Sequence, residues 1–310
     1  MDESLMERLG MADREPVPMA RLKLQRRMRP EIADLVRTTL YAHLCDHEQT
    51  KRYPPVAGLR KNLWLLDHTE PEEGSDDPAA VQSHRNNYEA GMIAGLLEYL
   101  LRNGYRSGDI AILTPYLSQM LLIRSKLSER YTVVFDERDA KLIAETLGEE
   151  ALGDEPNSRN GKVTGAQRLS LREQVTLRTV DNFQGEEAKI VLVSLVRNQL
   201  RGRGTIGFLK SSNRTNVLLS RAQHGMVLMG NAGLLREKSP MWRQIIELLE
   251  SRGQIGGGLP IACKRHNQGA VVASPEDFKK LSPDGGCSKV RHAGQRVFSR
   301  LTSWPCTTLP

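Results

Sequence analysis

Apolar residues along the chain follow two spacings, one typical of amphipathic helices and one typical of buried strands. In residues 87–102 they recur every three or four positions, which predicts a helix with one buried face. Residues 190–195 form an unbroken Ile-Val-Leu-Val-Ser-Leu run, which predicts a strand covered on both faces. Strand and helix patterns alternate along most of the chain, as in a parallel sheet between two helical layers. Helices are predicted over residues 31–44, 87–102, 116–128, 212–221 and 241–250, and strands over residues 63–66, 109–113, 133–135, 175–179, 190–195 and 226–229.

Two stretches interrupt this alternation and set the expected domain organisation. Residues 136–172 are charged and contain several Gly, Pro and Asn residues, a composition typical of a solvated, flexible insertion. Three consecutive glycines at positions 256–258 mark the end of the last helix-and-strand unit. We therefore expect one α/β domain over residues 1–255 and a basic, mostly irregular tail over residues 256–310.

Charge is distributed unevenly along the 310 residues, which have a formal net charge of +7. Residues 171–310 hold 21 Lys and Arg against 10 Asp and Glu, whereas residues 61–170 hold 12 against 18. A basic surface attracts nucleic acid because Lys and Arg release counterions from the phosphate backbone. Mildly basic domains also occur without such a partner, so the motifs have to support this interpretation.

The sequence shows no feature of a membrane or secreted protein. Its apolar runs are too short to cross a bilayer, and its first residues are acidic and lack an apolar signal core. The four cysteines are far apart and do not form a disulfide-rich pattern. We expect an intracellular protein without a membrane partner, in the nucleus or the cytoplasm.

The most specific motif is residues 179–187, with the sequence Thr-Val-Asp-Asn-Phe-Gln-Gly-Glu-Glu. It leads directly into the buried strand predicted at residues 190–195, and α/β domains place ligand-binding groups on such loops. Taken singly, Phe183 is an ordinary core residue, and Gln184 with Gly185 is an ordinary turn. The whole string in front of a buried strand favours a functional loop.

Three further segments carry candidate functional residues. Thr114, in the string Ile-Leu-Thr-Pro-Tyr, closes a predicted parallel strand, which is where α/β sheets bind ligands. Arg221, in the string Ser-Arg-Ala, lies at the end of a predicted helix ahead of a strand, and an arginine can stabilise the charge of a transferred phosphoryl group. Residues 25–30 form the basic string Gln-Arg-Arg-Met-Arg-Pro. The structural alternatives are a helix C-terminal cap at Arg221 and a solvated basic face at residues 25–30.

In this order the segments resemble the second RecA-like motor domain of the up-frameshift-like superfamily 1 RNA helicases. The resemblance implies an α/β fold, a RecA-like three-layer sandwich with a mainly parallel sheet. One departure is Arg26, which stands where the family pattern Gln-Tyr-Arg-Met-x-Pro has an aromatic residue. No Gly-x-x-x-x-Gly-Lys-Ser/Thr phosphate loop occurs in the 310 residues, so the resemblance implies ATP and Mg²⁺ only in a complete two-domain motor.

The resemblance also implies roles for individual residues. The catalytic residues, which would contact the γ-phosphate, are Arg27 and Arg221. The nucleotide-binding residues would be Gln25, Gln184, Gly185 and Glu187. Single-stranded RNA would be bound by Thr114, Pro115, Tyr116, Thr179, Val180 and Asp181. No residue is assigned to a metal. Residues 46–49 resemble the family's nucleotide-sensing Gly-Asp-x-x-Gln motif but occur in the wrong order, so we interpret them as a surface turn.

The tail resembles the junction that leads into cysteine-rich fingers in the NFX-type zinc-finger-containing helicases of small-RNA silencing. Cys263 and Cys287 begin such an array, but the pattern stops before Cys306. A structural zinc site needs four closely spaced Cys or His ligands, so we expect an incomplete zinc-finger-like start without zinc.

The sequence thus predicts the C-terminal motor half of an ATP-dependent RNA helicase that acts in RNA silencing or RNA surveillance. Alone it would be inactive as an ATPase, because the Walker A and Mg²⁺-binding motifs do not occur in it. Expected partners are single-stranded RNA, a first RecA-like motor domain in cis or in trans, and proteins of silencing complexes. The alternative is a non-catalytic RNA- or protein-binding module derived from a helicase.

Overall fold

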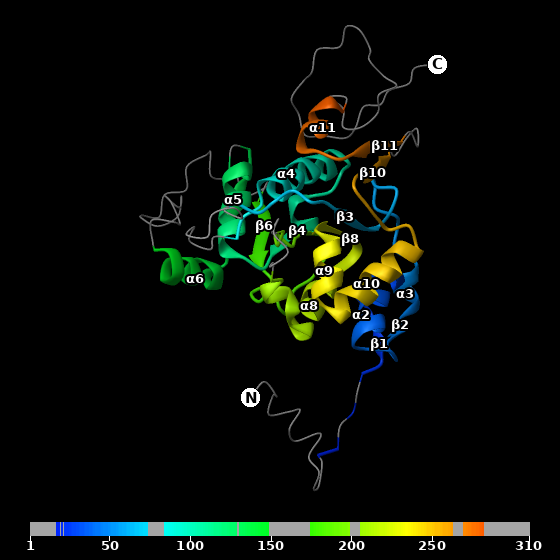
Figure 1. Ribbon diagram of the computed structural model, residues 1–310. Coiled ribbons are helices and arrows are strands. Elements are labelled where there is room, and N and C mark those ends of the chain that lie inside the picture. The colour runs from blue at the N-terminus through cyan, green and yellow to red at the C-terminus, as the bar shows by residue number, and fades with distance from the viewer. Residues whose placement is uncertain are drawn as a thin grey trace, which may run out of the picture.

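A seven-stranded sheet in which every pairing is parallel forms the centre of the protein (Figure 1). Across the sheet its strands are β5 (Thr132–Val134), β6 (Gln174–Thr179), β4 (Ile110–Thr114), β7 (Ala188–Ser194), β8 (Ala222–Gly230), β3 (Leu63–Asp67) and β9 (Ile255–Gly256). The computed structural model describes residues 17–18, 20, 22–73, 84–128, 130–148, 174–198, 205–262 and 269–281.

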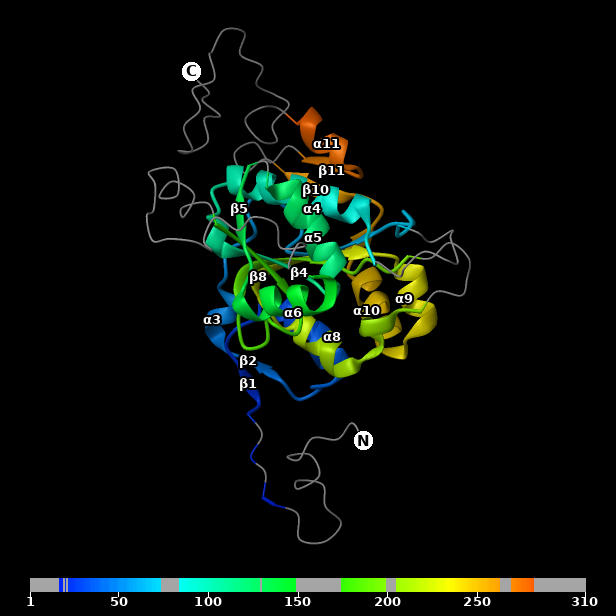
Figure 2. The ribbon, with the colours of Figure 1, turned by 90° about the vertical axis from the view of Figure 1, so that its left-hand side faces the viewer.

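Helices cover both faces of this sheet (Figures 1 and 2). Leu65 and Val193 pack with α2, α8 and α10 in one core, whereas Leu66 and Ile112 pack with α4 and α5 in the other. Neighbouring residues of one strand enter different cores because successive side chains point to opposite faces. The RecA-like three-layer α/β sandwich expected from the sequence is confirmed. The helices are α2 (Pro30–Thr39), α3 (Glu48–Lys51), α4 (Asn87–Arg102), α5 (Leu117–Leu127), α6 (Glu137–Leu147), α8 (Ser212–Leu219), α9 (Ala232–Lys238), α10 (Pro240–Ser251) and α11 (Pro275–Lys280).

Local hydrogen bonds move two element ends away from their predicted positions. The strand predicted from residue 109 begins one residue later, because Asp109 closes a 3-10 turn and its carboxylate accepts a hydrogen bond from Arg106 N at 3.1 Å. The helix predicted over residues 31–44 ends at Thr39. Beyond it, Leu44 O accepts a hydrogen bond from Arg37 Nη1 at 3.2 Å, and β2 (Cys45–Asp46) pairs with β1 (Leu24–Gln25).

The segment predicted as a flexible insertion, residues 136–172, begins with a packed helix. Ile143 of α6 has no exposed surface and belongs to the core that contains α4 and α5. Asp139 on the same helix is also fully buried. The high charge of the segment concealed this short helix, in which Ile143 is buried whereas Leu142 and Leu147 are exposed. Residues 149–173 lie outside the described part of the chain.

The tail predicted to be mostly irregular also begins with regular structure. β10 (Leu259–Ala262) pairs with β11 (Gly269–Val272), and α11 packs on α4 (Figure 2). The close approach uses two glycines of α4, because a Cβ at Gly91 would lie 2.8 Å from Pro275 Cγ and one at Gly95 would lie 2.4 Å from Phe278 Cδ2. The Gly-rich composition at the start of the tail hid this packing. The prediction of an incomplete zinc-finger start falls outside the described residues, which lack Cys263, Cys287 and Cys306. None of the helices described is long and apolar enough to cross a membrane.

Candidate functional site

The predicted site residues lie at two opposite edges of the parallel sheet. Thr114 and Thr179 are the last residues of neighbouring strands and face each other in register, so they lie at the carboxyl edge. Glu187 and Arg221 directly precede β7 and β8, so they lie at the amino edge. Residues 180–187 therefore run from one edge to the other in a single short crossing.

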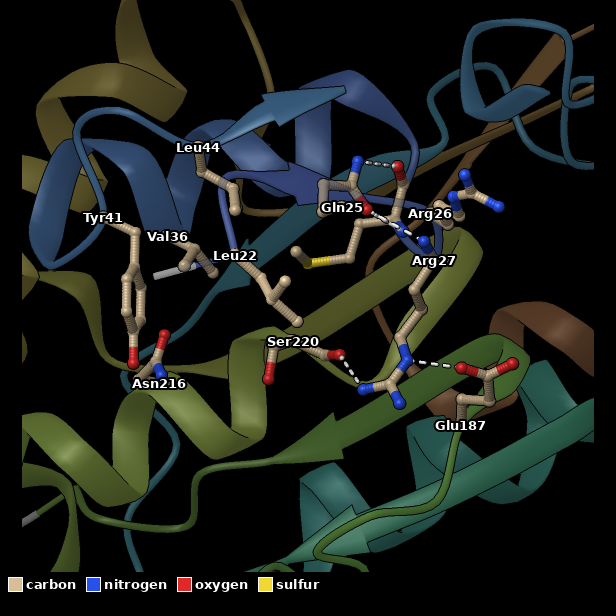
Figure 3. Close-up of a pocket in the computed structure, with 11 residues that line it drawn as sticks. Leu22, Gln25, Arg26, Arg27, Val36, Tyr41, Leu44, Glu187, Asn216 and Ser220 are labelled. Atoms are coloured by element: carbon tan, nitrogen blue, oxygen red, sulfur yellow. Dashed lines mark hydrogen bonds and ion pairs between the residues drawn. The ribbon is translucent and has the colours of Figure 1, made fainter. Parts of the chain in front are cut away.

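At the amino edge, Arg27 meets Glu187 across the junction of two distant chain segments. Arg27 Nε forms an ion pair with Glu187 Oε2, and Arg27 Nη1 donates to Ser220 O at 3.1 Å (Figure 3). Gln223 Nε2 donates to the other carboxylate oxygen at 2.7 Å. The side chains of Arg27 and Glu187 are 29% and 43% exposed. This pair is therefore open to a ligand that approaches from solvent.

Arg221 lies beside this pair but is almost enclosed, with 9% of its surface exposed. Burial, and to a smaller extent the positive charge of Arg27, lower the pKa of Arg221 to about 10, against the opposing effect of Glu187. Arg221 stays charged at neutral pH, so two cations stand beside one carboxylate, an arrangement that favours an anionic ligand. The hydrogen bonds of Arg221 go to Val217 O (2.7 Å), Glu186 O (3.3 Å) and Ser220 Oγ (2.7 Å).

Gln25, predicted to bind nucleotide, is engaged in its own loop and is 9% exposed. Its Oε1 accepts hydrogen bonds from Arg27 N at 2.9 Å and Met28 N at 2.7 Å. Its Nε2 donates to Met28 O and to Asp46 Oδ1, both at 2.7 Å. The structure thus gives Gln25 the task of shaping the turn that presents Arg27.

The interpretation of residues 46–49 as a surface turn is wrong, because Asp46 is part of β2 and supports the Gln25 turn. Burial alone would raise the pKa of Asp46, but hydrogen bonds from Arg37 and Gln25 outweigh burial and lower it. The Arg37 Nη1 to Asp46 Oδ1 distance is 2.8 Å. The order of the motifs could not predict the contact between Asp46 and Gln25, because this contact forms only when β1 pairs with β2.

A pocket of about 520 Å³ opens beside the Arg27–Glu187 pair (Figure 3). Its polar side is formed by this pair and Ser220. Its opposite side is formed by apolar and aromatic side chains, among them Leu22, Val36, Tyr41 and Leu44. Such a pocket suits a ligand that has an anionic group at one end and a planar or apolar group at the other.

At the carboxyl edge, Thr114 has no exposed surface, whereas Pro115 and Tyr116 are partly exposed. Thr114 Oγ1 accepts a hydrogen bond from Tyr116 N at 3.5 Å. The Tyr116 ring meets the His84 ring edge-on, with 4.7 Å between ring centres. Burial raises the pKa of Tyr116 to about 12, so its hydroxyl stays neutral at physiological pH. Of the three residues in this predicted RNA-binding string, two reach the surface.

The 180–187 crossing is fixed by its apolar residues and exposes its polar ones. Val180 and Phe183 are each 1% exposed and belong to the core, so at Val180 only the backbone is available to a ligand. Asp181, Gln184 and Gly185 are exposed. Gly185 has φ +92°, a conformation that glycine adopts without strain.

Sequence reasoning missed Asp139, which ties this crossing to α6. Its Oδ1 accepts hydrogen bonds from Thr179 Oγ1 at 2.7 Å and from Asn182 Nδ2 at 2.6 Å. Asp139 was placed in the predicted insertion, and its role becomes visible only when α6 packs beside β6. An aspartate between apolar positions of a charged helix was the available signal, and it is a weak one.

Comparison with known proteins agrees with this architecture. A family model described as an AAA domain matches residues 1–233. The NFX1-type zinc finger-containing protein 1 homolog of Caenorhabditis elegans is 33% identical over 274 residues, which cover 87% of this chain and 10% of that protein. The helicase required for RNAi-mediated heterochromatin assembly 1 of Schizosaccharomyces pombe is 32% identical over 265 residues, covering 84% of this chain and 22% of that protein.

The regulator of nonsense transcripts 1 of Dictyostelium discoideum is 27% identical over 267 residues, which cover 83% of this chain and 17% of that protein. The chain thus spans between a tenth and about a fifth of the length of these three relatives. The match over residues 1–233 covers most of the described sheet and all of the motif segments. The chain therefore belongs to this AAA-domain family, within the up-frameshift-like superfamily 1 helicases.

Proposed function

We propose that this chain is the second motor domain of an ATP-dependent RNA helicase, and that Arg27 and Arg221 act on the γ-phosphate of ATP. The observation that supports this most is the meeting of both arginines at Ser220, beside the half-exposed carboxylate of Glu187. Two neighbouring cations, of which Arg27 is partly exposed and Arg221 almost enclosed, match the spread of negative charge in phosphoryl transfer, which arginines stabilise.

ATP would be held between this domain and a first motor domain that supplies the phosphate loop and the carboxylates for Mg²⁺. Gln184, Gly185 and Glu187 would line the nucleotide side of the junction, and Gln25 would hold the Arg27 turn. The described residues contain no group of three Asp, Glu, His or Cys side chains placed to bind a metal. Arg27 is ready to exchange its Glu187 partner for phosphate, whereas Arg221 has to leave three hydrogen bonds.

Single-stranded RNA would lie along the carboxyl edge. Pro115 and Tyr116 would contact it through their exposed surfaces, and Thr114, Thr179 and Val180 mainly through the backbone or by shaping the edge. Asp181 already forms an ion pair with Arg214 at 3.6 Å, so RNA phosphates would compete for that arginine. A role in RNA silencing is supported by the name of the Schizosaccharomyces pombe relative, a helicase required for RNAi-mediated heterochromatin assembly.

The test combines the chain with a separately expressed first motor domain and measures ATP turnover with and without RNA. The chain alone should turn over no ATP, and the mixture should be active. Arg221→Ala is expected to reduce turnover of the mixture by about 10³-fold, because arginines at the γ-phosphate contribute on that order. Arg236→Ala, on α9 and paired with Glu250, is the control and should leave turnover unchanged.

Unchanged turnover with Arg221→Ala would refute the catalytic assignment. An inactive mixture that still binds RNA would favour the alternative, a binding module derived from a helicase. RNA binding by the chain alone is measured by fluorescence anisotropy with a labelled oligouridine at several salt concentrations. It should weaken steeply as salt rises, because phosphate contacts release counterions.

A further inference from the structure

Val196, two residues beyond the end of β7, has an unusual backbone conformation. Its φ is +69°, and it is the only non-glycine residue with positive φ among those that the structure describes. A β-branched side chain in the left-handed region is strained, and such strain persists only where surrounding interactions hold it. Strained residues concentrate at functional sites, which makes the Val196 turn a candidate for a functional role.

The cause of the Val196 conformation is Glu89, a carboxylate on α4 with no exposed surface. Its two oxygens lie 3.1 Å and 3.0 Å from Val196 N, which donates to them. The same carboxylate accepts hydrogen bonds from Ser194 Oγ at 2.5 Å and from His68 Nε2 at 3.0 Å. A buried carboxylate is costly unless its oxygens are bonded, and here both are bonded, to residues at and just beyond the end of β7 and to His68, which directly follows β3.

Glu89 stands near the start of α4, where a glutamate usually caps the helix. It is the third residue of α4, where a glutamate commonly bonds back to the amide of the N-cap residue. Here the N-cap amide, Asn86 N, donates instead to Gln119 Oε1 at 2.7 Å. The helix start is therefore satisfied without Glu89, whose carboxylate is left to hold Val196.

The Val196 turn sets the direction of the next residue, Arg197, which is 4% exposed. Arg197 Nη1 lies 2.7 Å from His84 Nε2, and Arg197 Nη2 donates to Thr205 Oγ1 at 3.1 Å. His84 Nδ1 lies 3.0 Å from Glu72 Oε2, and the His84 ring packs against the Tyr116 ring. The turn at Val196 thus directs Arg197 to the side chain that supports Tyr116.

We propose that Glu89 is a positioning residue for nucleic-acid binding, which holds the Val196 turn and thereby keeps the buried Arg197 in the contacts that position His84 and Tyr116 as a preformed contact surface for single-stranded RNA. This inference rests on the proposed binding of RNA at the carboxyl edge. Glu89 itself touches no RNA. It acts by keeping the binding-competent backbone populated, because apparent affinity falls in proportion to the fraction of molecules in that state.

The test is a cycle of Glu89→Gln and Val196→Gly in the full chain, with Kd for a labelled oligouridine measured by anisotropy at one fixed salt concentration. Glu89→Gln preserves the shape of the side chain and is expected to raise Kd about tenfold, as when a tenth of the molecules remain competent. Glycine adopts positive φ without strain, so in the Val196→Gly background the same substitution should raise Kd by less than about twofold. Glu98→Gln replaces a partly exposed carboxylate of the same helix, is the control and should leave Kd unchanged.

A merely structural role for Glu89 would lower stability but would not be rescued by glycine at position 196. Equal loss of affinity in both backgrounds, or wild-type affinity in Glu89→Gln, would overturn the inference. If Glu89→Gln does not fold, His84→Ala tests the same chain of contacts at a half-buried position. It should weaken RNA binding about fivefold by the same population argument, and an unchanged Kd would also overturn the inference. Absence of RNA binding by the wild-type chain would instead refute the proposed function and, with it, this inference.

Discussion

Replacing Asp139 by alanine is expected to weaken the crossing that joins the two edges of the sheet. Asp139 has no exposed surface, and it accepts hydrogen bonds from Thr179 Oγ1 at 2.7 Å and Asn182 Nδ2 at 2.6 Å. Thr179 is 5% exposed, so little water can replace the lost acceptor there. A buried donor left without a partner costs about 1–3 kcal/mol, and the half-buried Asn182 amide recovers part of its loss from water. We therefore expect Asp139→Ala to lower the free energy of unfolding by about 3 kcal/mol.

Equilibrium unfolding in urea measures this change. With an m-value of about 3 kcal/mol per M, the unfolding midpoint should fall by about 1 M at unchanged m. Asp139→Asn keeps one acceptor oxygen and should cost about 1 kcal/mol. Glu145→Ala removes an exposed carboxylate from the same helix and should cost less than about 0.5 kcal/mol. If Asp139→Ala and Glu145→Ala share one midpoint, the bonds of Asp139 do not stabilise the crossing and the reasoning is refuted.

Two further predictions concern the packing of α11 on α4. Gly95→Ala should lower the urea midpoint, because its Cβ would lie 2.4 Å from Phe278 Cδ2. In a Phe278→Ala background the same substitution should stabilise the protein by about 1 kcal/mol, because alanine has a higher helix propensity than glycine. If Gly95→Ala destabilises the protein in both backgrounds, or stabilises it in both, Gly95 and Phe278 do not pack against each other. Hydrogen bonds from Lys280 and the Ala273 amide lower the pKa of Asp277 from 3.8 to about 2. The stability that Asp277 contributes to α11 is therefore fully present above pH 3.8 and is lost as the pH falls through about 2. The NMR resonance of the Ala273 amide should accordingly titrate with a midpoint near 2. A midpoint near 3.8 would show that Asp277 does not cap α11.

The sheet could be predicted from the sequence because its central strands are apolar on both faces. The strands predicted at residues 63–66, 190–195 and 226–229 are buried almost throughout and occur as β3, β7 and β8. Their apolar runs leave no other compact arrangement once helices alternate with them. Residues 137–147 behave differently, since their charge outweighed a few apolar positions and hid α6.

The candidate site residues were predicted by motif, but the residues that hold them in place were not. Arg27 and Glu187 are 160 positions apart in sequence and meet only through the folded sheet. Glu89 and Asp139 form their bonds with strands that lie 105 and 40 positions away, respectively. Hydrophobic periodicity marks the buried face of a helix, yet it cannot show which buried carboxylate meets which backbone amide. That information arises from the strand order of the sheet, which only the structure supplies.

The crossing over residues 180–187 bears on how this domain would move within a motor. Its first amide, Val180 N, donates to Thr114 O at 3.3 Å, and beyond its other end Ala188 N donates to Arg221 O at 3.1 Å. Each end is thus tied to a residue predicted to bind a ligand, and Phe183 anchors the middle in the core. A short segment fixed at three points cannot shift without breaking buried contacts, and packed cores resist such deformation. The two edges proposed to bind nucleotide and RNA therefore belong to one rigid body, so in a complete motor we expect ATP-driven movement between the two motor domains rather than inside this one.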